Sequence, residues 1–190
     1  MIMRLSLLAA AVLLVFWSRP VVAAEYERSG DWVFQAQAFA EVGGETLSAC
    51  SASTKSLDGT ELSLRLEPAP DNAFEAGMSL TNESWALGQG QMRVRLDIGA
   101  DHWVLPAESD GSAVTVDWTG EASLLTFLED LSSSSFAAVI ARDGSTHAQF
   151  SLKGSRKAAE AMKTCVEVQI GRGLSQALEA GSPGGAATPF

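Results

Sequence analysis

Several short runs of this chain alternate apolar and polar residues, and this period of two constrains the fold more than any other feature. Leucine occupies every second position of 62–66, and Met92, Val94, Leu96 and Ile98 repeat the pattern with polar residues between them. The same alternation is found at 32–38 and 76–81. A strand with one buried face and one solvated face gives this pattern. The chain is therefore predicted to be mainly β.

Three Asp-Gly pairs lie between strand-like runs, at Asp58-Gly59, Asp110-Gly111 and Asp143-Gly144. Both residue types tolerate positive φ, so such a pair between two strands indicates a hairpin. The spacing predicts eight or nine strands, mostly antiparallel. We expect them to form a β-sandwich or a partly closed barrel.

Two segments have helical rather than strand periodicity, near 121–131 and near 155–168. The first contains an apolar stripe made of Leu124, Leu125, Phe127, Leu128 and Leu131. Apolar residues at this spacing share one face of a helix. The second segment follows Gly154 and has Ser155 as its candidate N-cap. Gly154 is predicted to need a backbone conformation that other residues dislike.

Residues 1–24 have the layout of a secretory signal peptide: Arg4, then an apolar run, then small residues ending at Ala24. The apolar run of about 13 residues is shorter than the ~18 needed to span a bilayer, which disfavours an uncleaved anchor. Cleavage after Ala23 or after Ala24 fits. We expect a periplasmic or secreted protein with no stable membrane insertion after cleavage. Residues 25–172 are predicted to form a single domain, and 173–190, rich in small residues, a flexible tail.

Export would bring the two cysteines, Cys50 and Cys165, into an oxidising compartment. A lone pair there most often forms a disulfide, although a pair of free thiols is the alternative. Neither cysteine belongs to a Cys-x-x-Cys motif, so the bridge is predicted to be structural. It would join the second helix to an early strand.

The chain is acidic, with a formal net charge of −10, and loss of Arg4 and Arg19 with the signal takes it to −12. Residues 25–150 hold 20 acidic and six basic side chains, whereas the charged side chains of 153–172 are mostly basic. Phosphate binding needs clustered Lys and Arg, so nucleic acid and anionic membrane surfaces are not expected partners. A cationic partner stays open beside the simpler alternative that the charge serves solubility.

The patterns that carry enzymatic chemistry are not found. Only two histidines are present, His102 and His147, too few for a typical histidine metal site. Asp101 and His102 are neighbours in a strand and would point to opposite faces. Gly88-Gln89-Gly90 lacks the Lys-Ser/Thr of a phosphate-binding loop. The sequence predicts no catalytic residue, no metal and no cofactor, and hence a protein that is not an enzyme.

Trp85 is the candidate residue for partner binding. It lies between polar Asn82-Glu83-Ser84 and Gly88-Gln89-Gly90, in a predicted loop rather than a strand. Tryptophan is enriched at the energetic centres of protein interfaces. The alternative is that it packs within its own loop or the core, as aromatic residues normally do.

The arrangement of several segments resembles a known group of exported proteins. It combines Asp31-Trp32-Val33, the cysteine strand 48–50, the run from Phe150 to Ser155, and a short helix with Cys165. Across roughly 31–167 the chain resembles the invasion-associated locus B family of small periplasmic proteins in Gram-negative bacteria. It more loosely resembles a periplasmic protein associated with type VI secretion. The resemblance implies a β-rich envelope protein without enzymatic activity, and it assigns no functional residues.

Three functions of different classes follow from these patterns. The first is an interaction or accessory module that binds an unknown envelope protein. The second is an inhibitor of a cationic secreted hydrolase, such as a lysozyme or protease, suggested by the acidic charge. The third is a carrier of a small apolar ligand, which a β-barrel can be.

Overall fold

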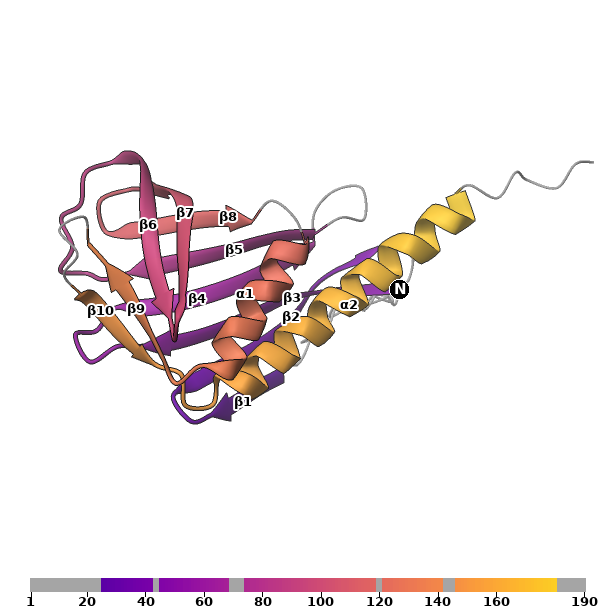
Figure 1. The fold of residues 1–190 in the computed structure, drawn as a ribbon. Coiled ribbons are helices and arrows are strands. Elements are labelled where there is room, and N and C mark those ends of the chain that lie inside the picture. The colour runs from indigo at the N-terminus through magenta and orange to yellow at the C-terminus, as the bar shows by residue number, and fades with distance from the viewer. Residues whose placement is uncertain (1–24, 43–44, 69–73, 119–120, 142–145, 181–190) are drawn as a thin grey trace, which may run out of the picture.

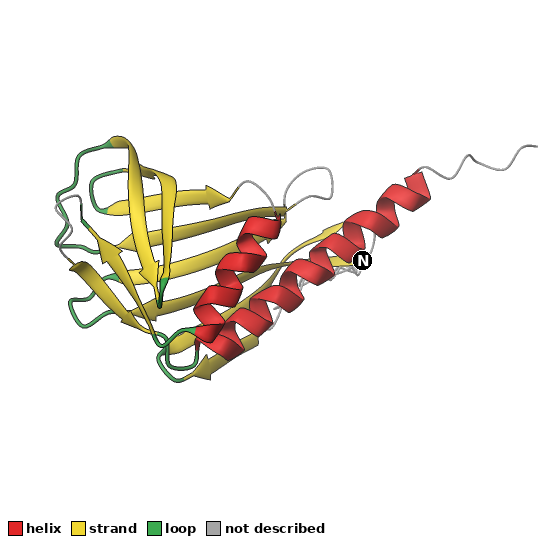
Figure 2. Cartoon of the chain, in the orientation of Figure 1, coloured by secondary structure: helices red, strands yellow, loops and turns green. Residues whose placement is uncertain are grey.

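The computed structural model describes residues 25–42, 45–68, 74–118, 121–141 and 146–180. The predicted signal peptide and residues 181–190 lie outside this part of the chain. These residues form ten strands and two helices, and Figures 1 and 2 show how they are arranged. In chain order they are β1 (Glu25–Ser29), β2 (Trp32–Val42), β3 (Glu45–Lys55), β4 (Glu61–Pro68), β5 (Phe74–Thr81), β6 (Gly90–Ile98), β7 (Asp101–Ser109), β8 (Ala113–Trp118), α1 (Glu121–Ser133), β9 (Phe136–Ile140), β10 (Thr146–Ser151) and α2 (Ser155–Ala180).

All ten strands belong to one antiparallel sheet with the order β1-β2-β3-β4-β5-β8-β7-β6-β9-β10. The sheet does not close, because β1 and β10 each pair with one neighbour among the described residues. The mainly antiparallel β fold with two helices is confirmed. The strand count exceeds the prediction of eight or nine. Alternation cannot reveal a strand such as β1, which lies at the edge and leaves Tyr26 62% exposed.

The hairpin signals mark the turns correctly where the structure describes them. Asp58-Gly59 lies in the turn between β3 and β4, and Asp110-Gly111 lies between β7 and β8. Gly59 and Gly111 both have positive φ, at 87° and 110°, which is the conformation that these turns need. Asp143-Gly144 lies outside the described residues, although β9 and β10 on either side of it pair antiparallel.

The predicted alternation becomes a buried face. In β4, Leu62, Leu64 and Leu66 are buried, whereas Arg65 between them is exposed. The helices cover this face: α1 and α2 lie side by side on the same side of the sheet (Figure 1). The apolar stripe of α1 meets the sheet there, and its residues Leu124, Phe127, Leu128 and Leu131 are buried.

Helix α2 buries the expected face, made of Ala158, Ala159, Met162, Cys165 and Val166. It is longer than predicted, however, since it continues to Ala180. It thus includes 173–180, which the sequence analysis assigned to the tail. That segment contains good helix formers such as Leu, Ala, Gln and Glu, and Gly171 and Gly173 cost only about 1 kcal/mol each within a helix. In the described chain, neither helix is long and apolar enough to cross a membrane.

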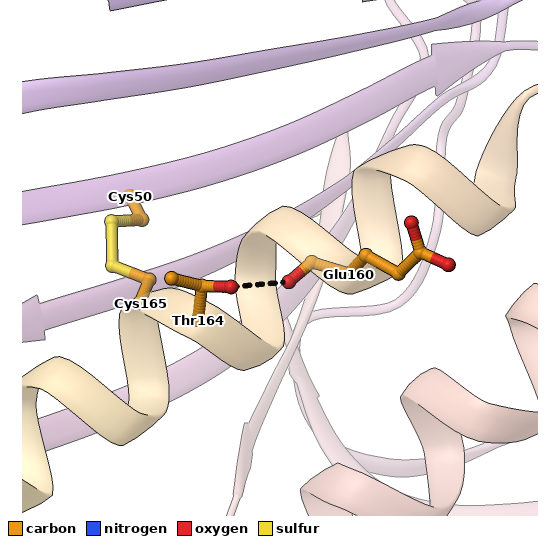
Figure 3. Close-up of a disulfide and its surroundings, with 4 residues drawn as sticks. All are labelled: Cys50, Glu160, Thr164 and Cys165. Carbon is orange, nitrogen blue, oxygen red and sulfur yellow. Dashed lines mark hydrogen bonds between the residues drawn. A yellow bond between two sulfur atoms is a disulfide. The ribbon is translucent and has the colours of Figure 1, made fainter.

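The predicted disulfide is present between Cys50 of β3 and Cys165 of α2 (Figure 3). The two Cα atoms are 6.6 Å apart, and the bridge joins positions separated by 115 residues. Beside it, the Thr164 hydroxyl donates to the Glu160 carbonyl oxygen at 3.0 Å within the helix. The covalent bond therefore fixes α2 against the strand that it covers.

A second contact joins the N-terminal strands to the start of α2, at Gly30 between β1 and β2 and at Gly154 before α2. Both have positive φ, at 59° and 94°. A Cβ on Gly154 would overlap the Ser29 carbonyl, and a Cβ on Gly30 would overlap the Lys153 carbonyl. The Asp31 amide donates to the Lys153 carbonyl oxygen at 3.0 Å. We call this contact between the β1–β2 turn and the start of α2 the glycine junction.

The junction extends to the neighbouring side chains. The indole Nε1 of Trp32 donates to the Ser151 carbonyl oxygen at 3.3 Å, and Trp32 itself is buried. The buried hydroxyl of Ser155 donates to the Leu131 carbonyl oxygen at 2.6 Å. This bond joins the first turn of α2 to the last turns of α1, a role different from the predicted cap of its own helix.

We expect Gly154→Val to lower the free energy of unfolding by about 3 kcal/mol or more, because it combines backbone strain with an overlap against Ser29. Gly59→Val is the matched control. Gly59 also has positive φ, but a Cβ there meets no atom within 4 Å, so it should cost only about 1–3 kcal/mol. Urea unfolding of both variants measures the difference. Equal losses would contradict the close approach at Gly154.

The double variant Cys50→Ala/Cys165→Ala should lose about 2–4 kcal/mol of stability, since the bridge restricts a long loop of the unfolded chain. Peptide mapping without reductant should recover Cys50 linked to Cys165 from exported protein. Two free thiols in that material would contradict the bridge.

Candidate functional site

The loop that carries Trp85, residues 82–89 between β5 and β6, is fixed at its start by Asn82. The buried Asn82 amide donates from Nδ2 to Thr60 Oγ1 at 2.9 Å and to the Asp58 carbonyl oxygen at 3.4 Å. Its Oδ1 accepts from the Ser84 amide at 2.8 Å and from the Ser84 hydroxyl at 2.6 Å. One side chain thus joins this loop to the β3–β4 turn.

The rest of the loop is held by the β7–β8 turn. The Leu87 amide donates to the Gly111 carbonyl oxygen at 2.8 Å, and Gln89 Nε2 donates to the Asp110 carbonyl oxygen at 3.0 Å. The Trp85 amide donates to the Asn82 carbonyl oxygen at 3.0 Å. Trp85 is therefore presented by a loop that is hydrogen-bonded to two neighbouring turns, which reduces the entropy lost on binding a partner.

The β3–β4 turn is organised around the Asp58 carboxylate. Oδ2 accepts from the Thr60 hydroxyl at 2.9 Å, and Oδ1 accepts from the Ser56 hydroxyl. These bonds favour the charged form, chiefly the one from Ser56, and hold the pKa of Asp58 below its ordinary value. The charged Asp58 carboxylate therefore stabilises the β3–β4 turn, to which Asn82 of the Trp85 loop is hydrogen-bonded.

Beside Trp85 lies a hollow of about 630 Å³. Its lining is mainly apolar and comes from the Trp85 loop and from β5, β6, β7, β8 and β9, with His147 from β10. The rings of Trp85 and His147 have centroids 5.1 Å apart and are tilted by 38°. The hollow is of the size that binds small ligands or a few side chains of a partner. Trp85, half-buried, forms part of its wall.

Three other hollows lie among the described residues. The one beside Gln89 and Asp110 is mostly polar, whereas the one between Arg28 and Gln149 and the one beside Arg93, Glu108 and Asp117 have polar and apolar surface in similar amounts. The Trp85 hollow differs from them because it offers mainly apolar surface framed by a few polar groups. Such surface is the usual basis of recognition in a binding site. We therefore take the Trp85 hollow as the candidate functional site.

Both histidines are exposed strand residues, His102 in β7 and His147 in β10. His102 Nδ1 lies 2.9 Å from Asp97 Oδ1, and Asp97 also accepts from Arg95 Nε at 2.8 Å. These contacts, chiefly the one from Arg95, lower the pKa of Asp97. Asp101, next in sequence, is exposed and is not the partner of His102. Within the described residues, no group of three His, Cys, Asp or Glu side chains could hold a metal ion.

The other three tryptophans of residues 25–190 serve the structure. Trp32 is buried, Trp103 donates from Nε1 to Asp130 Oδ2 at 2.9 Å, and Trp118 donates to Ser123 Oγ at 3.2 Å. The Trp103 and Trp118 rings both pack against Phe127 of α1. Trp85 also packs against the core, as the alternative from the sequence had it, and in addition lines the hollow.

Sequence reasoning did not find the remaining parts of the site. His147 belongs with Trp85 although 62 positions separate them in the chain, and no local pattern indicates this. Arg93 and Arg95 also line the hollow, whereas the sequence showed them only as the polar positions of a strand. The signal that could have found them is their charge, since they are two of only six basic residues between 25 and 150.

No protein-family model matches this chain, and no curated protein matches it. Among solved structures, the chain is similar to the crystal structure of invasion associated protein B from Bartonella henselae. The similarity covers 77% of this chain and 99% of that one, with a TM-score of 0.45 and 12% sequence identity. This neighbour belongs to the group that the sequence resembles. At this level of similarity it transfers no residue role.

We expect Asp58→Asn to destabilise the protein at neutral pH and to have little effect in acid. Because the folded state lowers the pKa of Asp58, its carboxylate stabilises the fold above the ordinary aspartate pKa of about 3.9, and this contribution is lost as the pH falls through the folded-state value. Thermal unfolding of both proteins between pH 7 and pH 3 checks this. A difference in melting temperature that is constant with pH would contradict it.

Proposed function

We propose that this protein is an exported, non-enzymatic module of the cell envelope that binds a partner protein through the Trp85 hollow. The observation that carries the proposal is the apolar hollow with Trp85 on its wall, held by a loop bonded to two adjacent turns. Aromatic anchors in well-packed, partly desolvated settings supply most of the energy of many interfaces.

The disulfide supports the exported location in the proposal. Bridges such as Cys50–Cys165 persist in oxidising compartments and are rare in the cytosol. The signal-like residues 1–24 agree with this, and a Gram-negative periplasm is the location that the sequence resemblance implies. The histidines support the non-enzymatic part, because His102 pairs with the Asp97 carboxylate, which also pairs with Arg95, and the His147 ring packs against the Trp85 indole.

Carriage of a small apolar ligand is the second candidate, since the hollow has the volume for one. We rank it lower because barrel carriers hold their ligand inside the barrel. Here the space between sheet and helices is filled by buried side chains such as Met78, Phe127 and Phe150. Native mass spectrometry of protein purified from its host would detect a retained ligand and would then favour the carrier.

The third candidate, inhibition of a cationic hydrolase, is suggested by the acidic composition of the chain and not by this hollow. Among the described residues, the charged side chains of its lining are Arg93 and Arg95, with no Asp or Glu. An inhibitor that uses its negative charge would therefore need another surface. Inhibition assays against lysozymes and basic proteases test this alternative directly.

Trp85→Ala should weaken the complex with the envelope partner by about tenfold or more while changing the free energy of unfolding by only about 1 kcal/mol. The measurement is recovery of the partner after crosslinking in the native envelope, followed by affinity measurement with the purified pair. Leu57→Ala is the control, because Leu57 is fully exposed at the tip of the β3–β4 turn and is not part of the hollow. Equal recovery with wild type and Trp85→Ala would remove the proposal.

A further inference from the structure

Strand β6 is paired along its whole length on one side only. All nine of its residues pair with β7, whereas only Arg95, Leu96, Asp97 and Ile98 pair with β9. Strand β9 ends at Ile140, opposite Arg95. Within the described residues, no strand pairs with 90–94 on the β9 side. Among the described residues, this half of β6 is thus an unpaired sheet edge on that side.

The backbone groups on that open side can be assigned from the alternation of an antiparallel ladder. The Gly99 amide donates to the Phe136 carbonyl oxygen at 3.3 Å, in continuation of the β6–β9 pairing. Backbone groups of every second residue point to the same side, and the register of β6 has no shift against either neighbour. The N–H and C=O groups of Gln91 and Arg93 thus point to the side on which β9 pairs with the second half of β6.

The Trp85 hollow lies along this edge. Its lining includes β6 residues of both faces: Met92 and Val94 on the face of the core, and Arg93 and Arg95 on the opposite face. Ile140, Ala141 and His147 line it as well. Because neighbouring side chains of one strand point to opposite faces, a hollow that touches both faces opens at the strand edge itself.

The two faces of the edge have different chemistry. On the core face, Trp85, Leu87 and Met92 provide apolar contacts. On the other face, Arg93 and Arg95 provide positive charge, and among the described residues no carboxylate lines the hollow. Arg95 is bonded to Asp97. Among the described residues, no ion pair is found for Arg93, and Glu108 and Asp117 line a second hollow with it.

We propose that the partner inserts an extended segment that pairs with Gln91 and Arg93 of β6 as an added strand. Its side chains alternate, with apolar residues against Trp85 and acidic residues against Arg93 and Arg95. In this mode main-chain hydrogen bonds give affinity, and alternate side chains give specificity. The inference rests on the proposed function and specifies which chemistry the hollow recognises.

The first test uses four blocked hexapeptides and the full protein. The sequence Glu-Leu-Glu-Leu-Glu-Leu should quench or shift the fluorescence of Trp85 and slow hydrogen exchange at the Gln91 and Arg93 amides. The Lys-Leu version should bind at least about tenfold more weakly, since it repels the two arginines. The Glu-Leu peptide with N-methyl groups on alternate amides should lose binding in one of its two methylation patterns. Equal binding of all forms, or no binding of the Glu-Leu peptide, would overturn the added strand.

The second test changes the edge while keeping the hollow. Gln91→Pro removes an outward N–H but leaves the ladder with β7, because proline is tolerated at strand edges. It should weaken binding of the Glu-Leu peptide about tenfold. Gln91→Val retains the N–H and is the matched control, and thermal unfolding verifies that both variants fold. Similar peptide affinities for the two variants would contradict a main-chain bond at this position.

The two proposals can fail separately. If Trp85→Ala abolishes the envelope complex while Gln91→Pro leaves it unchanged, the hollow binds a partner without an added strand, and only the edge inference is lost. If neither substitution affects the complex, both proposals are wrong. Loss with both variants, and not with Gln91→Val or Leu57→Ala, supports both.

Discussion

The glycine junction is the contact on which the rest of this structure depends. It brings the β1–β2 turn against the start of α2, at a distance that allows no side chain on Gly30 or Gly154. The hydrogen bond from the Asp31 amide to the Lys153 carbonyl oxygen lies in the same contact. Because the sheet itself does not close, this contact and the Cys50–Cys165 bridge hold the late chain over the early strands.

The backbones pack closely at the glycine junction, whereas the pairing of β6 with β9 covers only part of β6. The helices and the junction cover one part of the curved sheet, and buried side chains fill the space beneath them. Pairing stops early where β9 ends opposite Arg95. The hollow forms at this interruption, beside a loop fixed by Asn82 and by the β7–β8 turn. An extended peptide can pair with a sheet edge that is free of a neighbouring strand, and binding is more precise where the surrounding elements are rigid.

The sequence predicted the parts of the fold that depend on local patterns. Alternation at 62–66, the Asp-Gly turns and the stripe of α1 all act over a few residues, so they can be read from sequence alone. The length of α2 was not predicted, because the apolar face that indicated the helix covers only 158–166, and 173–190 were assigned to a flexible tail. Apart from Trp85, the residues of the site could not be predicted from the sequence either. An open edge depends on where two strands about 40 positions apart stop pairing, and no residue type marks that point.

The charge of the chain shows why composition constrains a partner less than position does. A net charge of −10 argues against anionic partners for the surface as a whole. Interactions between exposed charges fall off over about 8–10 Å at physiological salt, so a ligand in the hollow responds mainly to Arg93 and Arg95. The surrounding acidity then acts at longer range and would slow the approach of an acidic segment without preventing its binding. An acidic partner is thus compatible with an acidic protein, provided that its charges come to rest beside these two guanidinium groups.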